Sequence, residues 1–288
     1  MSANALTLPE GRTLGYDDVG DPGGAVVVYL HGTPDSRLAR HPDDTLAARA
    51  GVRLLAVDRL GYGRSSPAAS SLAEDLATLL DALGIDKATI LAWSGGALAG
   101  FTATAAPRLA GRVTALHVVA GVVPREAYDD HAVRQAAPER LGMIELGDQL
   151  PAGELANTVA PLLAPYPCDR TLAAQHQREQ RSAEDQAALA TVAGAVDQTA
   201  DALVEGVRAG LGGVRADVEA QVRRGVVDLD GVRPPVELTY GARDRVTPTA
   251  FGAWYAERIP QARLRVVSDA GHYLFFTHWD QLLRAMAE

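Results

Sequence analysis

A serine directly after an apolar run is the residue best placed to do chemistry in this sequence. Residues 90–93 are apolar, Ser94 follows them, and two glycines lead into a segment of small residues. A nucleophilic hydroxyl must project from a turn that neighbouring side chains do not crowd. The small residues Ala92, Gly95 and Gly96 permit such a corner between a strand and a helix. We therefore predict that Ser94 is a nucleophile for acyl transfer.

Two later segments supply the groups that such a serine requires. A serine hydroxyl is a weak nucleophile near neutral pH, so it needs a base within hydrogen-bond reach and a group that orients the base. Asp244 closes the sequence Gly241-Ala-Arg-Asp, and His272 closes the sequence Asp269-Ala-Gly-His, each after an apolar run. We predict Asp244 as the orienting acid and His272 as the base.

Asp269 and His278 are the nearest alternatives to these two residues. Asp269 precedes His272 by three positions, and because aspartate is common in turns we expect it to shape that loop. His278 lies where Thr277 and Asp280 would begin a C-terminal helix, so we expect it at a helix end on the surface.

Other sites of chemistry are not indicated. The histidines show no metal-ligand spacing with carboxylates or cysteine on one helix face, so we expect no metal. The segment around Ser94 lacks the Lys-Ser/Thr ending of a phosphate loop and the G-x-G-x-x-G of a dinucleotide fold, so we expect no cofactor. Cys168, between Pro167 and Asp169, has no neighbour that favours a thiolate, and we expect a structural or surface thiol.

The elements that must position these residues alternate along the chain. Apolar runs typical of buried strands cover residues 25–30, 53–57, 89–92, 113–120, 236–240 and 264–267, and residues 5–8 and 12–16 predict an antiparallel start. The clearest helix covers residues 71–83, where Ser71 and Glu74 form a capping box and Gly84 ends the helix. This alternation predicts the α/β class, with a mostly parallel central sheet covered by helices on both faces.

The alternation breaks between residues 124 and 228, which show helical spacing and no convincing strand. Apolar residues recur every three or four positions from 203 to 222, and glycines between residues 210 and 213 predict that this run is two helices. We predict a helical insertion at 124–228 between core segments 1–123 and 229–288.

Composition limits the class of protein and its partners. The chain has 288 residues, of which 47% are hydrophobic and 22% charged, as in ordinary folded proteins. Its net charge of −9 predicts no nucleic-acid partner and no anionic lipid surface. The N-terminus lacks a basic segment before an apolar run, and no stretch reaches the ~18 apolar residues of a membrane span. With one cysteine, the sequence fits a reducing compartment, and we expect a cytoplasmic protein without a membrane partner.

Taken together, these motifs resemble the α/β-hydrolases. Ser94, Asp244 and His272 occur in the chain order of that family. Ala92 stands where the family pattern G-x-S-x-G has its first glycine, which is a modest departure because a methyl group is small. The resemblance covers residues 5–123 and 232–288 better than the middle. It implies an α/β-hydrolase fold with an inserted helical cap over the active site.

The resemblance also assigns the groups that would hold a tetrahedral intermediate. The sequence His31-Gly-Thr-Pro34 follows the run 25–30, where the family keeps one backbone N–H of its oxyanion hole. The implied donors are therefore the N–H groups of Thr33 and Gly95. The segment 58–65 resembles the family's D-x-x-G-x-G-x-S turn, whose role would be architectural, with Arg59 or Tyr62 as side chains that could reach the pocket.

The substrate side is less determined by the sequence. Trp93 beside the nucleophile, and the apolar residues Leu162, Leu163 and Tyr166 of the insertion, are candidates for pocket walls. The same apolar run of the insertion could instead form the cap's own core.

The chain is similar to a His-Gly-x-Pro subgroup of the family that includes proline iminopeptidase-like and esterase-like members. It departs from the peptidase motifs His-Gly-Gly-Pro-Gly and Gly-x-Ser-Trp-Gly, and epoxide hydrolases and haloalkane dehalogenases have Asp where Ser94 stands. The expected substrate is a small-molecule carboxylic ester. Lactone, thioester, aminopeptidase and carbon–carbon bond hydrolysis stay open, as does a noncatalytic ligand-binding or cyclase role. The sequence carries no signal for an oligomeric state.

Overall fold

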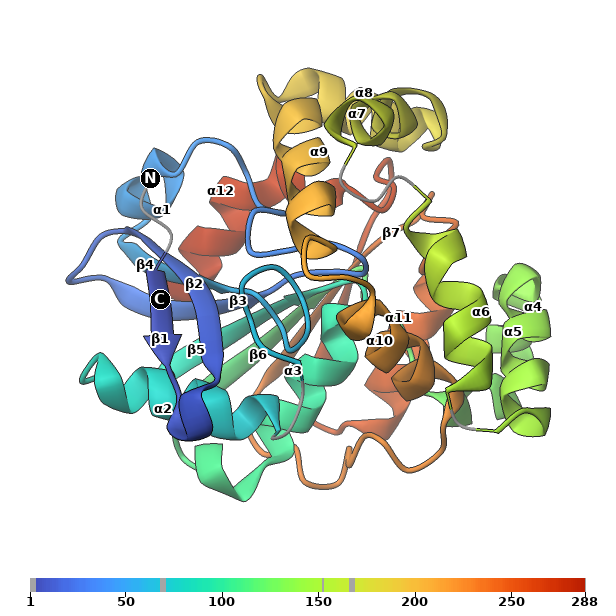
Figure 1. Ribbon diagram of the computed structural model, residues 1–288, viewed down its shortest axis with the longest axis horizontal. Helices are drawn as coiled ribbons and strands as arrows, with labels where there is room; N and C mark the ends of the chain where they lie inside the picture. The colour runs from blue at the N-terminus through green and yellow to red at the C-terminus, as the bar shows by residue number, and fades with distance from the viewer. Residues whose placement is uncertain (1–3, 68–70, 152, 166–168, 288) are drawn as a thin grey trace.

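An eight-stranded sheet forms the centre of the computed structural model, which describes residues 4–67, 71–151, 153–165 and 169–287 (Figure 1). The strand order is β1-β2-β4-β3-β5-β6-β7-β8, with β1 and β2 antiparallel to their neighbours and all later pairs parallel. The strands are β1 (Asn4–Thr7), β2 (Thr13–Gly20), β3 (Ala25–Leu30), β4 (Val52–Val57), β5 (Ala88–Trp93), β6 (Val113–Val119), β7 (Val236–Gly241) and β8 (Ala262–Val267). The predicted sheet, including its antiparallel start, is confirmed.

Burial along the strands follows their position in the sheet. All residues of β5 are buried, as expected for a central strand covered on both faces. By contrast, most of β8 is exposed, and Leu264 and Val266 reach the surface because β8 is the edge strand. The apolar run 264–267 therefore predicted the strand correctly but not its exposure.

Helices pack against both faces of the sheet. On one face lie α2 (Leu72–Ala82), α3 (Gly96–Ala105) and α11 (Thr249–Arg258), and on the other α1 (Thr45–Arg49) and α12 (Leu274–Ala287). The predicted helix 71–83 is confirmed as α2. The Ser71 side chain accepts a hydrogen bond from the Glu74 N–H at its start, and Gly84 follows with φ 66°.

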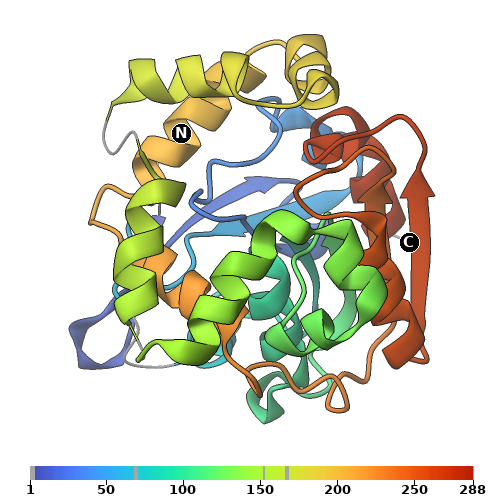
Figure 2. The same cartoon turned by 90° about the vertical axis from the view of Figure 1, so that its right-hand side faces the viewer.

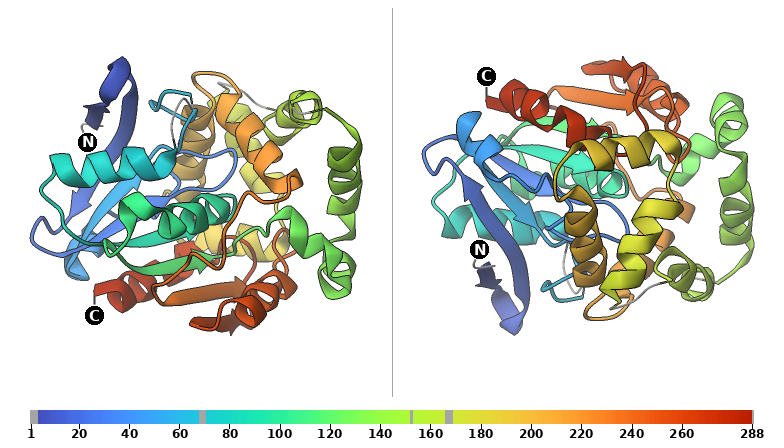
Figure 3. Two further views of the ribbon diagram at one scale, coloured as in Figure 1. Left: turned by 90° about the horizontal axis from the view of Figure 1, so that it is seen from below. Right: turned by 90° about the horizontal axis from the view of Figure 1, so that it is seen from above.

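The described part of the segment between β6 and β7 contains helices and no strand. These inserted helices are α4 (His131–Ala136), α5 (Pro138–Gln149), α6 (Glu154–Leu163), α7 (Arg170–Glu179), α8 (Ala183–Thr191), α9 (Ala195–Gly206) and α10 (Gly212–Val222). Figure 2 looks onto α5 and α6, and Figure 3 shows the inserted helices gathered at one end of the sheet. The predicted division of the run 203–222 into two helices is confirmed by α9 and α10. The exact domain bounds at 124 and 228 stay a prediction.

Glycines bring the inserted helices into close contact with the core. Gly213 donates its N–H to the carbonyl of Gly61 at 3.2 Å, and a Cβ on Gly61 would lie 2.7 Å from the Gly213 nitrogen. Gly63 donates to the carbonyl of Gly206 at 3.2 Å. These contacts leave no room for a side chain, so the start of α10 and the end of α9 lie directly on the loop after β4.

Candidate active site

Ser94 lies at the corner between β5 and α3, where the backbone is strained. Ser94 has φ 52°, which is unusual for a residue other than glycine and is found in tight turns that serve function. A Cβ on Gly96 would lie 2.5 Å from the carbonyl oxygen of Leu30, so glycine is required there for α3 to approach β3. Gly96, one of the small residues that predicted the corner, therefore has a direct steric role.

Ser94, His272 and Asp244 form one chain of hydrogen bonds. Ser94 Oγ lies 2.9 Å from His272 Nε2, and His272 Nδ1 lies 2.8 Å from Asp244 Oδ2. The three residues follow β5, β7 and β8, whose carboxyl ends meet at one edge of the sheet. All three side chains are buried. In this geometry the imidazole can accept the serine proton while the carboxylate stabilises its charged form.

The loop after β7 holds the Asp244 carboxylate in place. Oδ1 accepts hydrogen bonds from the N–H groups of Val246 and Thr247, at 2.7 and 2.9 Å. Oδ2 accepts the Thr247 hydroxyl at 2.6 Å in addition to His272. Burial raises the pKa of Asp244, but the charge of His272 and these hydrogen bonds outweigh it, and the pKa lies below its ordinary value. Asp244 is thereby kept ionised beside the imidazole.

Asp269 and His278, the alternatives to Asp244 and His272, are not part of this chain of hydrogen bonds. Asp269 is exposed and accepts a hydrogen bond from the neighbouring Ser268 hydroxyl, in keeping with a role in the loop. The expectation that Thr277 begins the last helix is wrong, because α12 begins at Leu274. His278 therefore lies inside α12, half-buried, with Nδ1 3.0 Å from the Leu274 carbonyl oxygen.

The two predicted oxyanion donors lie side by side. A Cβ on Gly95 would be 2.1 Å from Thr33 Oγ1 and 3.1 Å from the Thr33 nitrogen, so only glycine lets these backbones approach. Within the described residues, neither N–H is paired with a protein acceptor. Two such donors beside a serine can bind the oxyanion of a tetrahedral intermediate.

A buried ionic network fixes the loop that carries Thr33. Arg59 donates Nε to the carbonyl of His31 at 2.9 Å and Nη2 to the carbonyl of Gly32 at 3.0 Å. Both its terminal nitrogens lie 2.6 Å from Asp217 of α10, which also accepts the hydroxyls of Thr33 and Tyr62. Arg59 and Tyr62 thus point to Asp217, and they do not line the cavity above Ser94 described next.

A cavity of about 470 Å³ opens above Ser94 between the core and the inserted helices. Trp93, Leu162 and Leu163, three of the predicted wall residues, line it. Leu162 and Leu163 lie at the end of α6 and are 73% and 39% exposed, so they border the cavity and solvent rather than a core of the insertion. The fourth predicted wall residue, Tyr166, lies outside the described residues, as does Cys168.

Charged residues share this cavity with the apolar ones. Asp35, which follows Pro34 in the loop that carries Thr33, is 3% exposed and lines the cavity. Burial raises the pKa of Asp35 to about 6, although the charges of Arg181, His272 and Arg59 oppose the rise. Arg181, from the segment between α7 and α8, lines the same cavity.

Three carboxylates around the site were not singled out from the sequence. Asp217 contacts Arg59, Asp185 of α8 accepts the N–H of Tyr273 at 2.9 Å directly after His272, and Asp35 lies in the cavity wall. Asp217 lies in a helix without a motif. Asp185 lies in a Ser-x-x-Asp helix start, capped by Ser182, which indicates a helix end but no contact with the segment of His272. Asp35 had one usable signal, its position directly after the His-Gly-Thr-Pro sequence.

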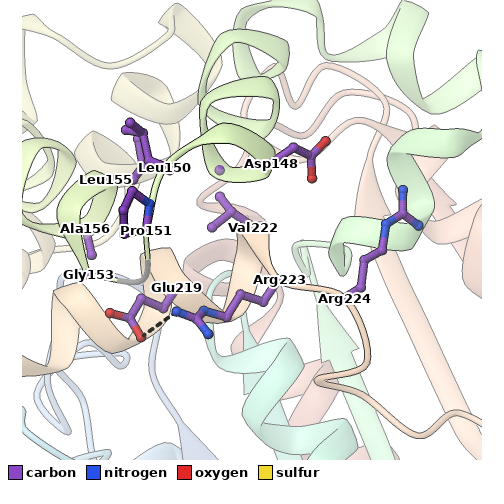
Figure 4. Close-up of a pocket in the computed structure, with 11 residues that line it drawn as sticks. Asp148, Leu150, Pro151, Gly153, Leu155, Ala156, Glu219, Val222, Arg223 and Arg224 are labelled. Carbon is purple, nitrogen blue, oxygen red and sulfur yellow. Dashed lines mark ion pairs between the residues drawn. The ribbon is translucent and has the colours of Figure 1, made fainter.

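A second cavity lies apart from these residues. It has a volume of about 330 Å³ and is formed by α5, α6, α10 and their flanking loops, with none of Ser94, Asp244 and His272 in its wall (Figure 4). Glu219 and Arg223 pair across 4.0 Å at its edge. It offers no nucleophile with an adjacent base.

The described residues contain no group of three or more histidine, cysteine, aspartate or glutamate side chains that could hold a metal ion. None of the helices described has the length and apolar content needed to cross a bilayer.

Comparison with curated proteins finds short matches. Fifty residues are 48% identical to a pimeloyl-[acyl-carrier protein] methyl ester esterase from Aromatoleum aromaticum, covering 17% of this chain and 20% of that protein. A match of 41% identity to an epoxide hydrolase from Caballeronia sordidicola covers 26% of this chain and 25% of the relative. The chain thus matches only about a fifth to a quarter of the length of these relatives.

Solved structures match over the whole chain. An esterase from Rhodococcus sp. ECU1013 superimposes with a TM-score of 0.63 at 21% identity, covering 100% of this chain and 98% of that one. An α/β hydrolase fold protein from Nakamurella multipartita gives 0.65 at 22% identity, covering 99% of each chain. At these identities the likeness shows the fold. The model of the α/β hydrolase fold family matches residues 25–278, and the chain belongs to this family.

Proposed function

We propose that the protein is a serine hydrolase that cleaves small-molecule carboxylic esters through an acyl-enzyme. The observation that carries this proposal is the hydrogen-bonded chain from Ser94 through His272 to Asp244 at a cavity of about 470 Å³. The similarity to solved esterases and the short match to a methyl ester esterase support the same class of substrate.

In the first half-reaction, Ser94 Oγ attacks the ester carbonyl carbon while His272 Nε2 takes the hydroxyl proton. The carbonyl π bond breaks and its oxygen becomes an oxyanion beside the N–H groups of Thr33 and Gly95. The oxyanion then collapses, the bond to the alcohol oxygen breaks, and His272 returns its proton to the leaving alcohol. Water repeats the sequence on the acyl-enzyme and releases the acid.

The residue type at position 94 favours this reaction over epoxide opening, although epoxide hydrolases are among the relatives. A serine hydroxyl activated by His272 forms an acyl-enzyme with a carbonyl substrate, and the adjacent pair of N–H donors suits the oxyanion that such attack creates. An epoxide ring has no carbonyl oxygen to develop that charge.

The inserted segment 124–228 would act as the cap of this active site. Leu162 and Leu163 border the cavity from α6, so truncating them to alanine is expected to change which acyl chains are accepted. An acetate ester, which reaches less far, should stay a substrate. Unchanged chain-length selectivity in both folded variants would place specificity in the core loops.

A fluorophosphonate probe tests the proposal. The protein should be labelled and should hydrolyse members of a panel of 4-nitrophenyl and alkyl esters, whereas Ser94→Ala should do neither. Ser268→Ala removes an exposed hydroxyl and is the matched control. An unlabelled, folded wild-type protein would favour a ligand-binding role. If the protein is labelled and hydrolyses lactones or thioesters but none of the esters, its substrate class is lactones or thioesters instead of carboxylic esters.

A further inference from the structure

A buried carboxylate without a hydrogen-bond partner faces the cavity of the proposed active site. Asp35 is 3% exposed, it lines the cavity that contains Ser94, and its Oδ1 has no partner among the described residues. Taking an ionised carboxylate out of water costs free energy unless hydrogen bonds or an opposite charge replace the water. The proposed steps of ester hydrolysis give Asp35 no task. A group that the folded chain leaves unpaired at a ligand cavity suggests that the ligand supplies the partner.

The groups around Asp35 form a polar corner next to the base. Arg181 lines the same cavity, donates its Nε to Gln177 Oε1 at 2.7 Å and lies over the Tyr273 ring at 5.2 Å. The Tyr273 hydroxyl donates to the same Gln177 oxygen at 3.3 Å. Gln177 is completely buried, and its Nε2 has no hydrogen-bond partner among the described residues. Gln177 does not itself line the cavity, and it supports Arg181 and Tyr273, which do.

The charges in this corner select among ligand groups. An alkyl group would leave the carboxylate unpaired, and a ligand carboxylate would be repelled by Asp35. An ammonium group would meet the positive charge of Arg181, which lines the same cavity. A neutral hydroxyl has neither disadvantage, because it donates one hydrogen bond to a carboxylate and accepts another from a cationic donor.

We infer that Asp35 and Arg181 form a polar subsite that binds a hydroxyl group of the substrate, so that the preferred substrates are hydroxylated esters. This inference rests on the proposed function and names its substrate class. The hydroxyl can belong to the acyl part or to the alcohol part of the ester, since both extend from the carbonyl carbon that Ser94 attacks.

Matched pairs of esters test the inference, and they show whether the hydroxyl belongs to the acyl part or to the alcohol part of the substrate. One arm compares ethyl butanoate with the ethyl esters of 2-, 3- and 4-hydroxybutanoate. The other compares propyl butanoate with the monobutanoate of 1,3-propanediol. The wild-type protein should show a kcat/KM at least about tenfold higher for one hydroxylated ester than for its plain partner, as expected for a hydrogen bond to a charged group.

Two variants connect that preference to Asp35. Asp35→Leu keeps the approximate shape but removes the acceptor, and it should abolish the preference. Asp35→Asn keeps a weaker acceptor and should give an intermediate ratio. Asp86→Leu makes the same chemical change at an exposed position before β5, at the opposite end of that strand from Ser94, and should keep the wild-type ratio.

Thermal unfolding distinguishes a binding role from a structural one. If Asp35 serves the ligand, removing an unpaired buried charge should raise Tm in Asp35→Leu and in Asp35→Asn. A lower Tm in both variants, with the substrate preference retained, would make Asp35 a structural residue and overturn the inference. Should Asp35→Leu fail to fold, the ratio and the Tm of Asp35→Asn decide.

Binding to Ser94→Ala keeps the test independent of turnover. This variant should bind the hydroxylated member of at least one pair more tightly than the plain member, measured by ligand-induced shifts of Tm. Equal binding and equal kcat/KM within every pair would overturn the inference, while hydrolysis of the plain esters would leave the proposed function standing. Absence of labelling by the fluorophosphonate would contradict the proposed function alone.

Discussion

The carboxylate of Asp217 accepts hydrogen bonds from both terminal nitrogens of Arg59, each at 2.6 Å, and thereby joins inserted helix α10 to the loop after β4. Both side chains are largely buried, with 5% of Arg59 and 13% of Asp217 exposed. Because Arg59 also binds the carbonyls of His31 and Gly32, a charge on an inserted helix helps to shape the loop that presents Thr33.

Asp217→Ala should lower the free energy of unfolding by about 3–5 kcal/mol, because it leaves the buried guanidinium of Arg59 without its charge partner. The double variant Arg59→Met/Asp217→Leu should recover part of this loss, since two apolar residues replace both charges. Urea unfolding measures both effects. Asp280→Ala, which breaks an exposed pair with Arg284, is the control and should change little. A double variant as unstable as Asp217→Ala would show that the charge pair itself is not the cause.

His272→Ala should reduce esterase turnover to the level of Ser94→Ala, because nothing else within the described residues pairs with Ser94 Oγ. His278→Ala removes a half-buried imidazole whose hydrogen bonds, within the described residues, are to Thr277 and Leu274 of its own helix, and it should keep most of the turnover. The steady-state kcat of His272→Ala and of His278→Ala is measured with the same ester. A larger loss of kcat in His278→Ala than in His272→Ala would identify His278 of α12 as the general base.

Asp244→Asn should lower kcat strongly, by up to about 10⁴-fold, with a smaller change in KM, because it keeps the geometry but favours the wrong imidazole tautomer. Asp269→Asn changes an exposed carboxylate in the adjoining loop and is the matched control. Steady-state kinetics of both folded proteins decide between them. If Asp269→Asn is the more damaging, the acid has been misassigned.

Gly95→Ala should lower kcat by about 10²–10³-fold, the range for loss of one oxyanion donor. The added methyl group would lie 2.1 Å from Thr33 Oγ1 and force the two N–H groups apart. Gly142→Ala, in α5, meets nothing within 4 Å and should raise the free energy of unfolding by about 0.5–1 kcal/mol without loss of turnover. Full activity of Gly95→Ala would remove this N–H from the proposed mechanism.

Asp35 should make the protein less stable as pH rises. Its pKa of about 6 in the folded chain exceeds the ordinary value of 3.8, so the protonated form is favoured by folding. The stabilising contribution is complete below about pH 4 and is lost as pH rises through 6. The groups facing Asp35 are Arg181, His272, Arg59, Tyr29 and Tyr273.

Asp35→Asn does not titrate and measures this effect directly. The variant should match the wild-type free energy of unfolding near pH 4 and exceed it by about 3 kcal/mol near pH 8, because one pKa unit corresponds to about 1.4 kcal/mol. Urea unfolding at both pH values, with Asp86→Asn as the surface control, provides the measurement. A difference that does not grow with pH would mean that the folded protein holds Asp35 ionised at no cost.

The sequence predicted the residues whose signal is local. Ser94, Asp244 and His272 each follow an apolar run and lie in a short motif of small or polar residues, and parallel strands bring such positions to one edge. The start of α12 was misplaced because Thr277 and Asp280 imitate a helix start, whereas the helix begins three residues earlier at Leu274.

Contacts between segments that are far apart in the sequence could not be predicted from such local motifs. Asp217 lies 158 residues from Arg59 in the sequence, and nothing in α10 distinguishes it from an exposed helical aspartate. Its burial against the loop that carries Thr33 depends on how α10 packs, which hydrophobic periodicity does not specify. The unpaired state of Asp35 is likewise a property of the packed structure, since it depends on what surrounds the carboxylate after folding.

The backbone contact between Gly61 and Gly213 limits how this protein can be re-engineered. A chimaera that takes its insertion from another family member will place a side chain of that relative at position 213, within 3 Å of the Tyr62 ring, unless the donor also has glycine there. The insertion and residues 58–65 are therefore expected to be transferable only as a pair. Laboratory recombination libraries should find most of their folded members among crossovers that keep these two segments from one parent.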